Sequence, residues 1–130
     1  MIIDTSAIIA IVRREPGWEE LRYALEVSTA RTSAGTLAEL LIVTGAGMSV
    51  EIREAAMSIV RDAGTEIVSL TADDASAAAD AYLRFGKGKH PAKLNMGDCF
   101  AYALAKRTGE PLLCVGNDFP QADLPLVPLP

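Results

Sequence analysis

Four acidic residues stand out because each is the only charged side chain in a stretch of apolar and small residues. A buried carboxylate without a partner loses its hydration, so Asp and Glu are almost never fully buried unless they are paired or bind a metal. Four such residues in separate segments predict that they share one cation. They are Asp4 in MIIDTSAIIA, Glu39 in TLAELLIV, Asp98 in LNMGDCFAYALA and Asp118 in GNDFPQ.

The segments that carry these residues alternate between expected strands and expected helices. MII predicts a short buried strand ending at Asp4, and Thr5 or Ser6 is suited to cap a helix that runs to about Arg14. The alternation predicts an α/β fold with a mostly parallel sheet covered by helices on both faces. Further strands are expected at TARTSA, EIVSL, PLLCVG and LPLVPL, and further helices at 18–27, 36–45, 49–62, 71–85 and 96–108.

This arrangement places the four carboxylates near one edge of the expected sheet. Asp4 ends the first strand, and Asp118 lies just past the PLLCV strand. Ligands in open α/β sheets bind outside the carboxyl ends of the strands. Asp98 falls in the first turn of a helix capped by Asn95, and Glu39 falls in the first two turns of another helix. We therefore expect all four side chains to face the same crevice.

Each carboxylate also has an ordinary structural interpretation. Asp4 is suited to cap a helix, Asp98 to bond back to Asn95, and Asp118 to stabilise a turn. Glu39 is the hardest to explain in this way, because its helix is apolar on nearly every face. A helix of that kind is expected to be buried, and a carboxylate within it needs a partner.

Length and composition predict one soluble domain over residues 1–130. Half of the residues are hydrophobic, which suffices for a core of this size. No stretch approaches the run of about 18 apolar residues that crosses a membrane, and the start lacks the basic region of a signal peptide. The two cysteines lack metal-type spacing and are expected to be reduced. We expect a cytoplasmic protein.

The net charge of −5 argues at first against a nucleic-acid partner, but much of it comes from the four lone carboxylates. Positive charge gathers in RFGKGKHPAK, where Lys87, Lys89 and Lys93 suit the phosphates of RNA, although they also suit a solvated loop. His90, the only histidine, is expected to be exposed in this loop. A mechanism that needs two histidines is therefore excluded.

The segments MIIDTSAIIA, TLAELLIV, LNMGDCFAYALAK and LLCVGNDFPQADL together resemble PIN-domain ribonucleases of the VapC toxin type, in the same order and at similar spacing. This resemblance implies a three-layer α/β/α PIN domain that cleaves RNA with Mg²⁺ or Mn²⁺. It carries the catalytic and metal-binding roles onto Asp4, Glu39, Asp98 and Asp118, with Asp4 and Asp98 as the most direct ligands. Val115 departs from the pattern, because a lysine or another polar residue often stands there.

The resemblance also implies partners. A cognate antitoxin encoded alongside would inhibit the enzyme, either as a toxin–antitoxin hetero-oligomer or on a toxin homodimer. An antitoxin can bind by inserting an arginine among the carboxylates while its apolar remainder fills a groove. We expect the first helices to line that groove, around Ile8, Ile11, Trp18 and Leu21.

Competing families fit the residues less well. A haloacid-dehalogenase-type phosphatase needs a second aspartate two residues after Asp4, where this chain has Ser6. A receiver-type signalling domain needs paired acids after its first strand and a lysine after its last core strand, and neither is present. The remaining alternative is a non-catalytic acidic domain whose main role is binding a basic partner peptide.

Overall fold

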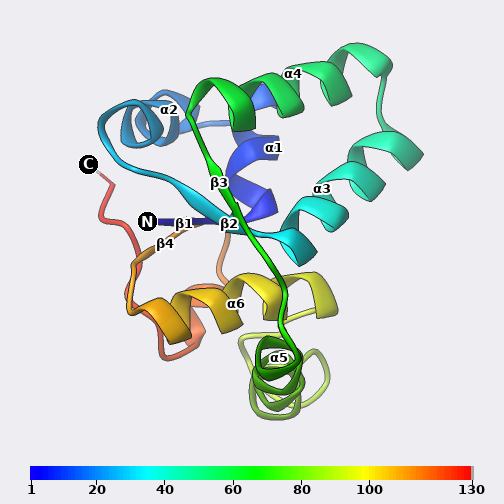
Figure 1. Ribbon diagram of the computed structural model, residues 1–130, viewed down its shortest axis with the longest axis vertical. Coiled ribbons are helices and arrows are strands. Elements are labelled where there is room, and N and C mark those ends of the chain that lie inside the picture. Colours follow the sequence, from blue (N-terminus) through cyan, green and yellow to red (C-terminus); the bar gives the residue numbers. More distant parts are fainter. Residues whose placement is uncertain (130) are drawn as a thin grey trace.

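A computed structural model describes residues 1–129 as a four-stranded sheet between two layers of helices (Figure 1). The sheet is entirely parallel, with the strand order β3-β2-β1-β4. Helices α1 to α4 lie on one face and helices α5 and α6 on the other, so the predicted three-layer α/β/α architecture is confirmed. The strands are β1 (Ile2–Ile3), β2 (Arg31–Ser33), β3 (Glu66–Val68) and β4 (Leu112–Leu113).

The helices begin largely where the sequence predicts them. Ser49 caps α4, and Thr71 and Asn95 form complete capping boxes at the starts of α5 and α6. Gly109, in the left-handed region at φ 70°, ends α6 as expected. The helices are α1 (Thr5–Arg13), α2 (Trp18–Val27), α3 (Ala34–Gly47), α4 (Val50–Asp62), α5 (Ala72–Phe85) and α6 (Met96–Thr108), followed by the 3₁₀ helix η1 (Phe119–Gln121).

The central strands supply side chains to two separate cores. Ile2 and Leu112 pack with residues of α5 and α6, whereas Ile3 and Leu113 pack with residues of α1, α2 and α4. Successive side chains of a strand point to opposite faces, so two residues per strand suffice to join both layers. All four side chains are buried. This packing fixes the carboxyl ends of β1 and β4, where Asp4 and the segment before Asp118 follow.

Three expectations about elements were wrong, two of them about α3. Helix α3 is buried on one side only, at Leu40 and Thr44, whereas Ile42 is 67% exposed and Val43 is 39% exposed. This helix is also capped by Ser33 and starts at Ala34, earlier than the predicted start at Thr36.

The LPLVPL segment is not a regular strand, because it contributes only a single bridge between Leu112 and Leu126. Its prolines have no N–H to donate, so a longer ladder of hydrogen bonds cannot form there.

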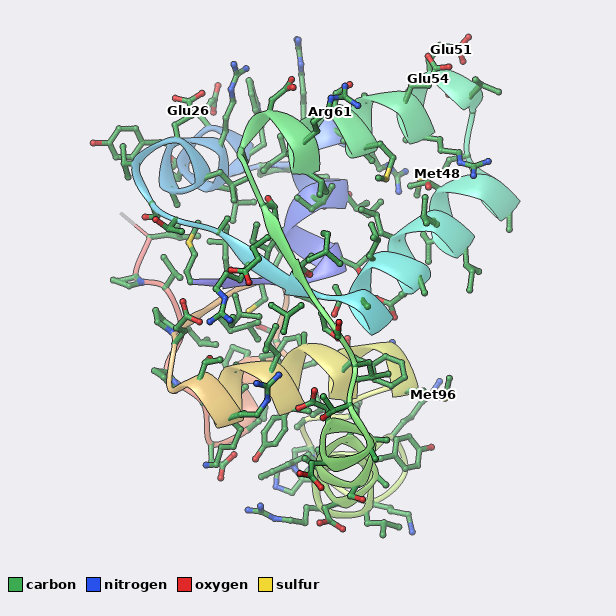
Figure 2. The ribbon with its side chains drawn as sticks, in the orientation of Figure 1. Glu26, Met48, Glu51, Glu54, Arg61 and Met96 are labelled. Carbon is green, nitrogen blue, oxygen red and sulfur yellow. The ribbon has the colours of Figure 1, made fainter. Side chains whose placement is uncertain are left out.

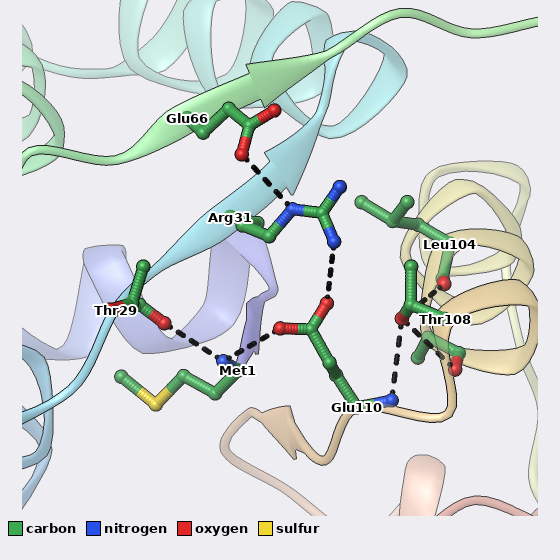
Figure 3. A network of polar contacts seen from close by, with 8 residues as sticks. Met1, Thr29, Arg31, Glu66, Leu104, Thr108 and Glu110 are labelled. Carbon is green, nitrogen blue, oxygen red and sulfur yellow. Dashed lines mark hydrogen bonds and ion pairs between the residues drawn. The ribbon is translucent and has the colours of Figure 1, made fainter.

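Charged residues join the beginnings of the strands, at the end of the sheet opposite to Asp4 (Figure 3). The carboxylate of Glu110 contacts the Met1 amine at 3.2 Å and the Arg31 guanidinium at 2.9 Å. Arg31 Nε also lies 3.2 Å from the carboxylate of Glu66. These contacts connect the residues at or next to the starts of all four strands, so this edge is tied together independently of the acidic edge.

Helices α5 and α6 are held together by packing and by an ion pair in which the acid is buried and the arginine is partly exposed. Arg107 donates to both carboxylate oxygens of Asp74, at 2.8 and 3.2 Å. Cys99 and Cys114 are free thiols, as expected. Within residues 1–129, no helix combines the length and apolar composition needed to cross a bilayer.

Candidate functional site

Asp4 follows β1 and caps α1. Its Oδ2 accepts a hydrogen bond from the backbone N–H of Ser6 at 3.0 Å, so the expectation that Thr5 or Ser6 would be the cap was wrong. The two hydroxyls serve other contacts instead. Thr5 Oγ1 donates to the carbonyl of Thr36 at 3.4 Å, and Ser6 Oγ accepts from the N–H of Val115 at 3.0 Å. The start of α1 is thereby joined to α3 and to the end of β4.

The capping role leaves half of the Asp4 carboxylate without a partner. Asp4 is only 2% exposed, and its Oδ1 is buried with no hydrogen bond to any described residue. The pKa of Asp4 is raised from 3.8 to about 6, mainly because the carboxyl is buried; the hydrogen bonds from Ser6 oppose this rise and the nearby charge of Glu39 adds to it. An unpaired buried oxygen of this kind is a suitable ligand for a cation.

Asp98 lies in the first turn of α6, where it completes the capping box. Its Oδ2 accepts from the N–H of Asn95 at 2.9 Å, and its own N–H donates to Asn95 Oδ1 at 2.9 Å. The cap therefore occupies one carboxylate oxygen. Burial raises the pKa of Asp98 from 3.8 to about 7, and repulsion from the other three site carboxylates adds to the effect, namely Asp4, Glu39 and Asp118.

Glu39 extends from the second turn of α3 to the start of α6. Its carboxylate lies so close to Gly97 that a Cβ at position 97 would overlap it. The absence of a Cβ at the second residue of α6 thus leaves room for the observed position of the Glu39 carboxylate. We did not select Gly97 from the sequence, although a glycine inside the first turn of a helix is a usable signal, because it costs helix stability.

Asp118 is the most exposed of the four acids. It stands at the N-cap position of η1, but its side chain makes no capping hydrogen bond. Its negative charge is close enough to Asp98 to raise the pKa of that carboxyl. The turn interpretation of Asp118 therefore accounts for its backbone position and leaves its carboxylate free.

The four carboxylates come from four different segments to the carboxyl edge of the sheet, as their spacing predicted. Within residues 1–129 there is no ready-made cage, since nowhere do three or more His, Cys, Asp or Glu side chains converge closely enough to hold an ion. The donors nevertheless fit Mg²⁺ or Mn²⁺, because both ions prefer oxygen ligands and Asp4 presents a buried oxygen without a partner. Their role as metal ligands stays a prediction.

The lysine segment between α5 and α6 is exposed, and its RNA-binding role also stays a prediction. Lys87, Lys89 and Lys93 are all exposed, and Lys93 adopts a left-handed backbone at φ 53°. His90 was expected to be exposed but is partly buried. Its Nδ1 accepts a hydrogen bond from the N–H of Ala92 at 3.0 Å, so the imidazole stabilises the conformation of this loop.

A groove of about 570 Å³ lies between α1, α2 and α4, away from the acids. Ile11 and Trp18 line it, as expected for two of the four residues named from the sequence, and its binding of an antitoxin stays a prediction. Ile8 and Leu21 do not, because both are buried in the core beneath it. The apolar floor consists of Ile11, Val12, Trp18, Leu25, Ile59 and Ala63.

The chain matches known proteins over nearly its whole length. The PIN domain family model matches residues 1–124. Ribonuclease VapC42 of Mycobacterium tuberculosis is 44% identical over 126 residues, which cover 95% of this chain and 96% of that protein. Ribonuclease VapC30 of the same species is 41% identical over 132 residues, which cover both proteins completely.

Solved structures agree on the fold at lower sequence identity. The toxin VapC20 of Mycobacterium tuberculosis, described as cleaving the Sarcin-Ricin loop, superposes with a TM-score of 0.77 at 18% identity over 97% of both chains. VapBC2 of Rickettsia felis, bound to a promoter DNA fragment, gives a TM-score of 0.72 at 16% identity over 99% of this chain and 98% of the other. The chain therefore belongs to the PIN-domain family and, within it, to the VapC ribonucleases.

Proposed function

We propose that this protein is the toxin of a type II toxin–antitoxin pair and an endoribonuclease that hydrolyses RNA phosphodiester bonds with Mg²⁺ or Mn²⁺. The relatives named VapC ribonucleases support the activity, since they match the chain from end to end. We further propose that residues 1–130 form one PIN domain that acts in the cytoplasm.

One observation carries the catalytic assignment. The negative charges of Asp4, Glu39 and Asp118, each from a different segment of the chain, all raise the pKa of Asp98. Like charges gathered in this way destabilise the fold unless a cation compensates for them. A fold that keeps such a cluster at the carboxyl edge of its sheet is best explained by a metal-dependent site.

The side chains divide the work according to their positions. Asp4 and Asp98 would be the principal metal ligands, because capping bonds at 3.0 and 2.9 Å orient their carboxylates. Glu39 and Asp118 would complete the acidic site. A bound Mg²⁺ or Mn²⁺ would polarise the phosphoryl oxygen and acidify the attacking water. Hydrolysis by water would leave a 5′-phosphate and a 3′-hydroxyl, without any need for the RNA 2′-hydroxyl.

The partners follow from the same assignment. Lys87, Lys89 and Lys93 would hold the RNA backbone, because lysine suits phosphates more than base edges. A cognate antitoxin would bind and inhibit the toxin, and the toxin would form either a homodimer or a hetero-oligomer with the antitoxin. Matching structures include toxin–antitoxin complexes from Klebsiella pneumoniae and Rickettsia felis.

RNA cleavage by the purified protein tests the proposal. We expect EDTA to abolish cleavage and Mg²⁺ or Mn²⁺ to restore it. Asp4→Asn and Asp98→Asn should each lower kcat by roughly 100-fold or more, comparable to the loss of one group that stabilises a transition state. Glu39→Gln and Asp118→Asn should cost less. Undiminished cleavage by Asp98→Asn would refute the site, and absence of cleavage under all metal conditions would favour an acidic binding domain instead.

A further inference from the structure

A small cavity lies behind Asp4, on the side of the sheet covered by α1 and α3. Its volume is about 10 Å³, close to the space that one water molecule needs. Half of the residues around it are apolar, including Ile3 and Leu40, and the other half are four threonines and Asp4. Glu39, Asp98 and Asp118 do not line it, so Asp4 is the only one of the four site carboxylates that borders this cavity.

Three side-chain oxygens at this cavity are buried without hydrogen-bond partners among the described residues. One is Oγ1 of Thr65, and the other two are Oδ1 of Asp4, which is 2% exposed, and Oγ1 of Thr36, which is 3% exposed. Asp4 and Thr36 are neighbours, because Thr5, next to Asp4 in the chain, donates its hydroxyl hydrogen to the carbonyl of Thr36 at 3.4 Å. Unpaired buried polar groups are costly, and native proteins usually satisfy them with ordered water.

A third threonine completes a set of partners at this end of the cavity. Thr32 Oγ1 donates its hydrogen to the carbonyl of Ile3 at 2.9 Å, so its lone pairs can still accept a hydrogen bond. Buried waters typically make about three hydrogen bonds. A water here can donate to Asp4 Oδ1 and Thr32 Oγ1 and accept from the hydroxyl of Thr36, which gives Asp4 and Thr36 the partners that they lack.

We infer that Thr36 positions Asp4 through one buried water molecule shared with Thr32. This inference rests on the proposed function, in which Asp4 is a metal ligand. The water would bind one lone pair of Asp4 Oδ1 while Ser6 binds Oδ2, so the carboxylate is held in one orientation and a second lone pair of Oδ1 stays available to a cation. Thr36 is therefore a positioning residue that never touches RNA or metal.

Two substitutions at Thr36 separate hydrogen bonding from packing. Thr36→Val keeps the shape and removes the hydroxyl, whereas Thr36→Ser keeps the hydroxyl and removes a methyl group. Loss of a group that orients a metal ligand typically lowers metal affinity by about 10-fold to 100-fold. Mn²⁺ affinity, measured by the loss of the free Mn²⁺ EPR signal, should fall by about 10-fold in Thr36→Val and stay near the parent value in Thr36→Ser.

Thr65 provides a matched control. Its Oγ1 is also buried and unpaired among the described residues, and it lines the same cavity. Thr65 and Asp4 lie at different heights along the sheet. Ile2, Arg31 and Glu66 are paired side by side, and Thr65 comes one residue before this row whereas Asp4 comes two residues after it. Thr65→Val should leave Mn²⁺ affinity unchanged even if it alters thermal stability.

A high-resolution crystal structure of the parent gives a second, independent test. It should show one water bonded to Asp4 Oδ1 and Thr36 Oγ1. A dry cavity, or Mn²⁺ affinity that falls in Thr36→Ser and not in Thr36→Val, would overturn the inference. Failure of the proposed function is recognised separately, since the parent would then bind no Mn²⁺ or Asp4→Asn would bind it as well as the parent does.

Discussion

Asp4 and Asp98 cap helices in a way that leaves room for the metal-binding role that we propose for them. Each uses one carboxylate oxygen to cap a helix, and each keeps a second oxygen for another role. From sequence, capping and metal binding looked like alternatives. The geometry removes the conflict, because a carboxylate has about four lone-pair positions and a cap uses only one or two. The capping bond also fixes the orientation that a metal ligand needs.

The raised pKa of Asp98 predicts a stability that depends on pH. The unfolded chain ionises this carboxyl near 3.8, whereas the folded protein ionises it near 7. Between these values the folded state binds the extra proton, so stability from this group is present at low pH and is lost as pH rises through about 7. Asp98→Asn removes this loss of stability because an amide does not ionise. Its side-chain oxygen should still accept the capping hydrogen bond from the N–H of Asn95.

We therefore expect metal-free Asp98→Asn to melt above the parent at pH 8, and the difference to shrink towards pH 5. A change of 1 kcal/mol shifts the melting temperature of a domain of this size by roughly 4 °C. With saturating Mn²⁺ at pH 8 the parent should gain more than the variant, because a ligand that binds the folded state stabilises it. Equal gains for both proteins would count against Asp98 as a ligand.

Gly97 gives a sharper test of Glu39 than a change at Glu39 itself. Gly97→Ala places a methyl group where the Glu39 carboxylate lies, so this carboxylate must move from its observed position. We expect RNA cleavage to fall about as far as in Glu39→Gln.

Gly47 is the matched control, since a Cβ there would meet nothing within 4 Å. Gly47→Ala should keep full activity and stabilise the protein by up to about 1 kcal/mol. The measurements are kcat for RNA cleavage and the melting temperature. Full activity in Gly97→Ala would show that cleavage does not require the observed position of Glu39.

At the scale of elements, local signals predicted most boundaries and missed those set by tertiary contacts. The side chains of Ser49, Thr71 and Asn95 cap helices as their sequence patterns indicated. The surface exposure of α3 was missed because apolar periodicity cannot say what covers a helix, and Ile42 is left uncovered. The close approach of α3 to α6 at Gly97 and the cavity beside Thr36 depend on packing between distant segments, which no local pattern encodes.

The connection between α5 and α6 carries three exposed lysines, Lys87, Lys89 and Lys93. A bridge between Gly86 and Leu94 closes the segment, and backbone bonds from Lys87 to Leu94 and from Leu94 to Phe85 hold its base. Figure 2 shows Met96, at the start of α6, extending away from the protein next to this segment. The lysine side chains project from a fixed base, which suits contacts with a nucleic-acid backbone.

Replacing Lys87, Lys89 and Lys93 together with Ala should weaken RNA binding similarly for different RNA sequences. It should also reduce the dependence of log K on log salt, by about 0.7 per lost phosphate contact on a single strand. Binding measured at several salt concentrations gives this slope. Arg53→Ala with Arg61→Ala is the control, because these residues lie on α4 in the opposite layer. An unchanged slope in the lysine variant would assign the loop to ordinary solvated surface.

At the scale of the whole molecule, the fold separates three regions that can be altered independently. The charged contacts around Arg31 and Glu110 tie the starts of the strands together. The carboxylates gather at the opposite edge of the sheet, and the groove between α1, α2 and α4 forms a third region. Figure 2 shows Glu26 and Arg61 around the outer surface of the helices that form this groove.

The separation of groove and acidic site leads to our last prediction, which concerns the antitoxin. Trp18 lines the groove, whereas Tyr23 on the same helix is 64% exposed and lies outside it. Buried aromatic anchors commonly carry 2 kcal/mol or more of binding free energy, which corresponds to roughly 30-fold in affinity. Trp18→Ala should therefore weaken binding of the cognate antitoxin by about that factor and leave RNA cleavage unchanged. Tyr23→Ala should alter neither.

Inhibition itself should depend on a second contact, at the carboxylates. An arginine from the antitoxin can satisfy two carboxylate oxygens at once, and it would compete with metal for Asp4 and Asp98. Inhibition should thus weaken as Mn²⁺ concentration rises, and an Arg→Ala antitoxin should still bind the groove but inhibit poorly. If both antitoxins inhibit equally at every Mn²⁺ concentration, the partner acts by covering the RNA path, and the groove alone accounts for the affinity.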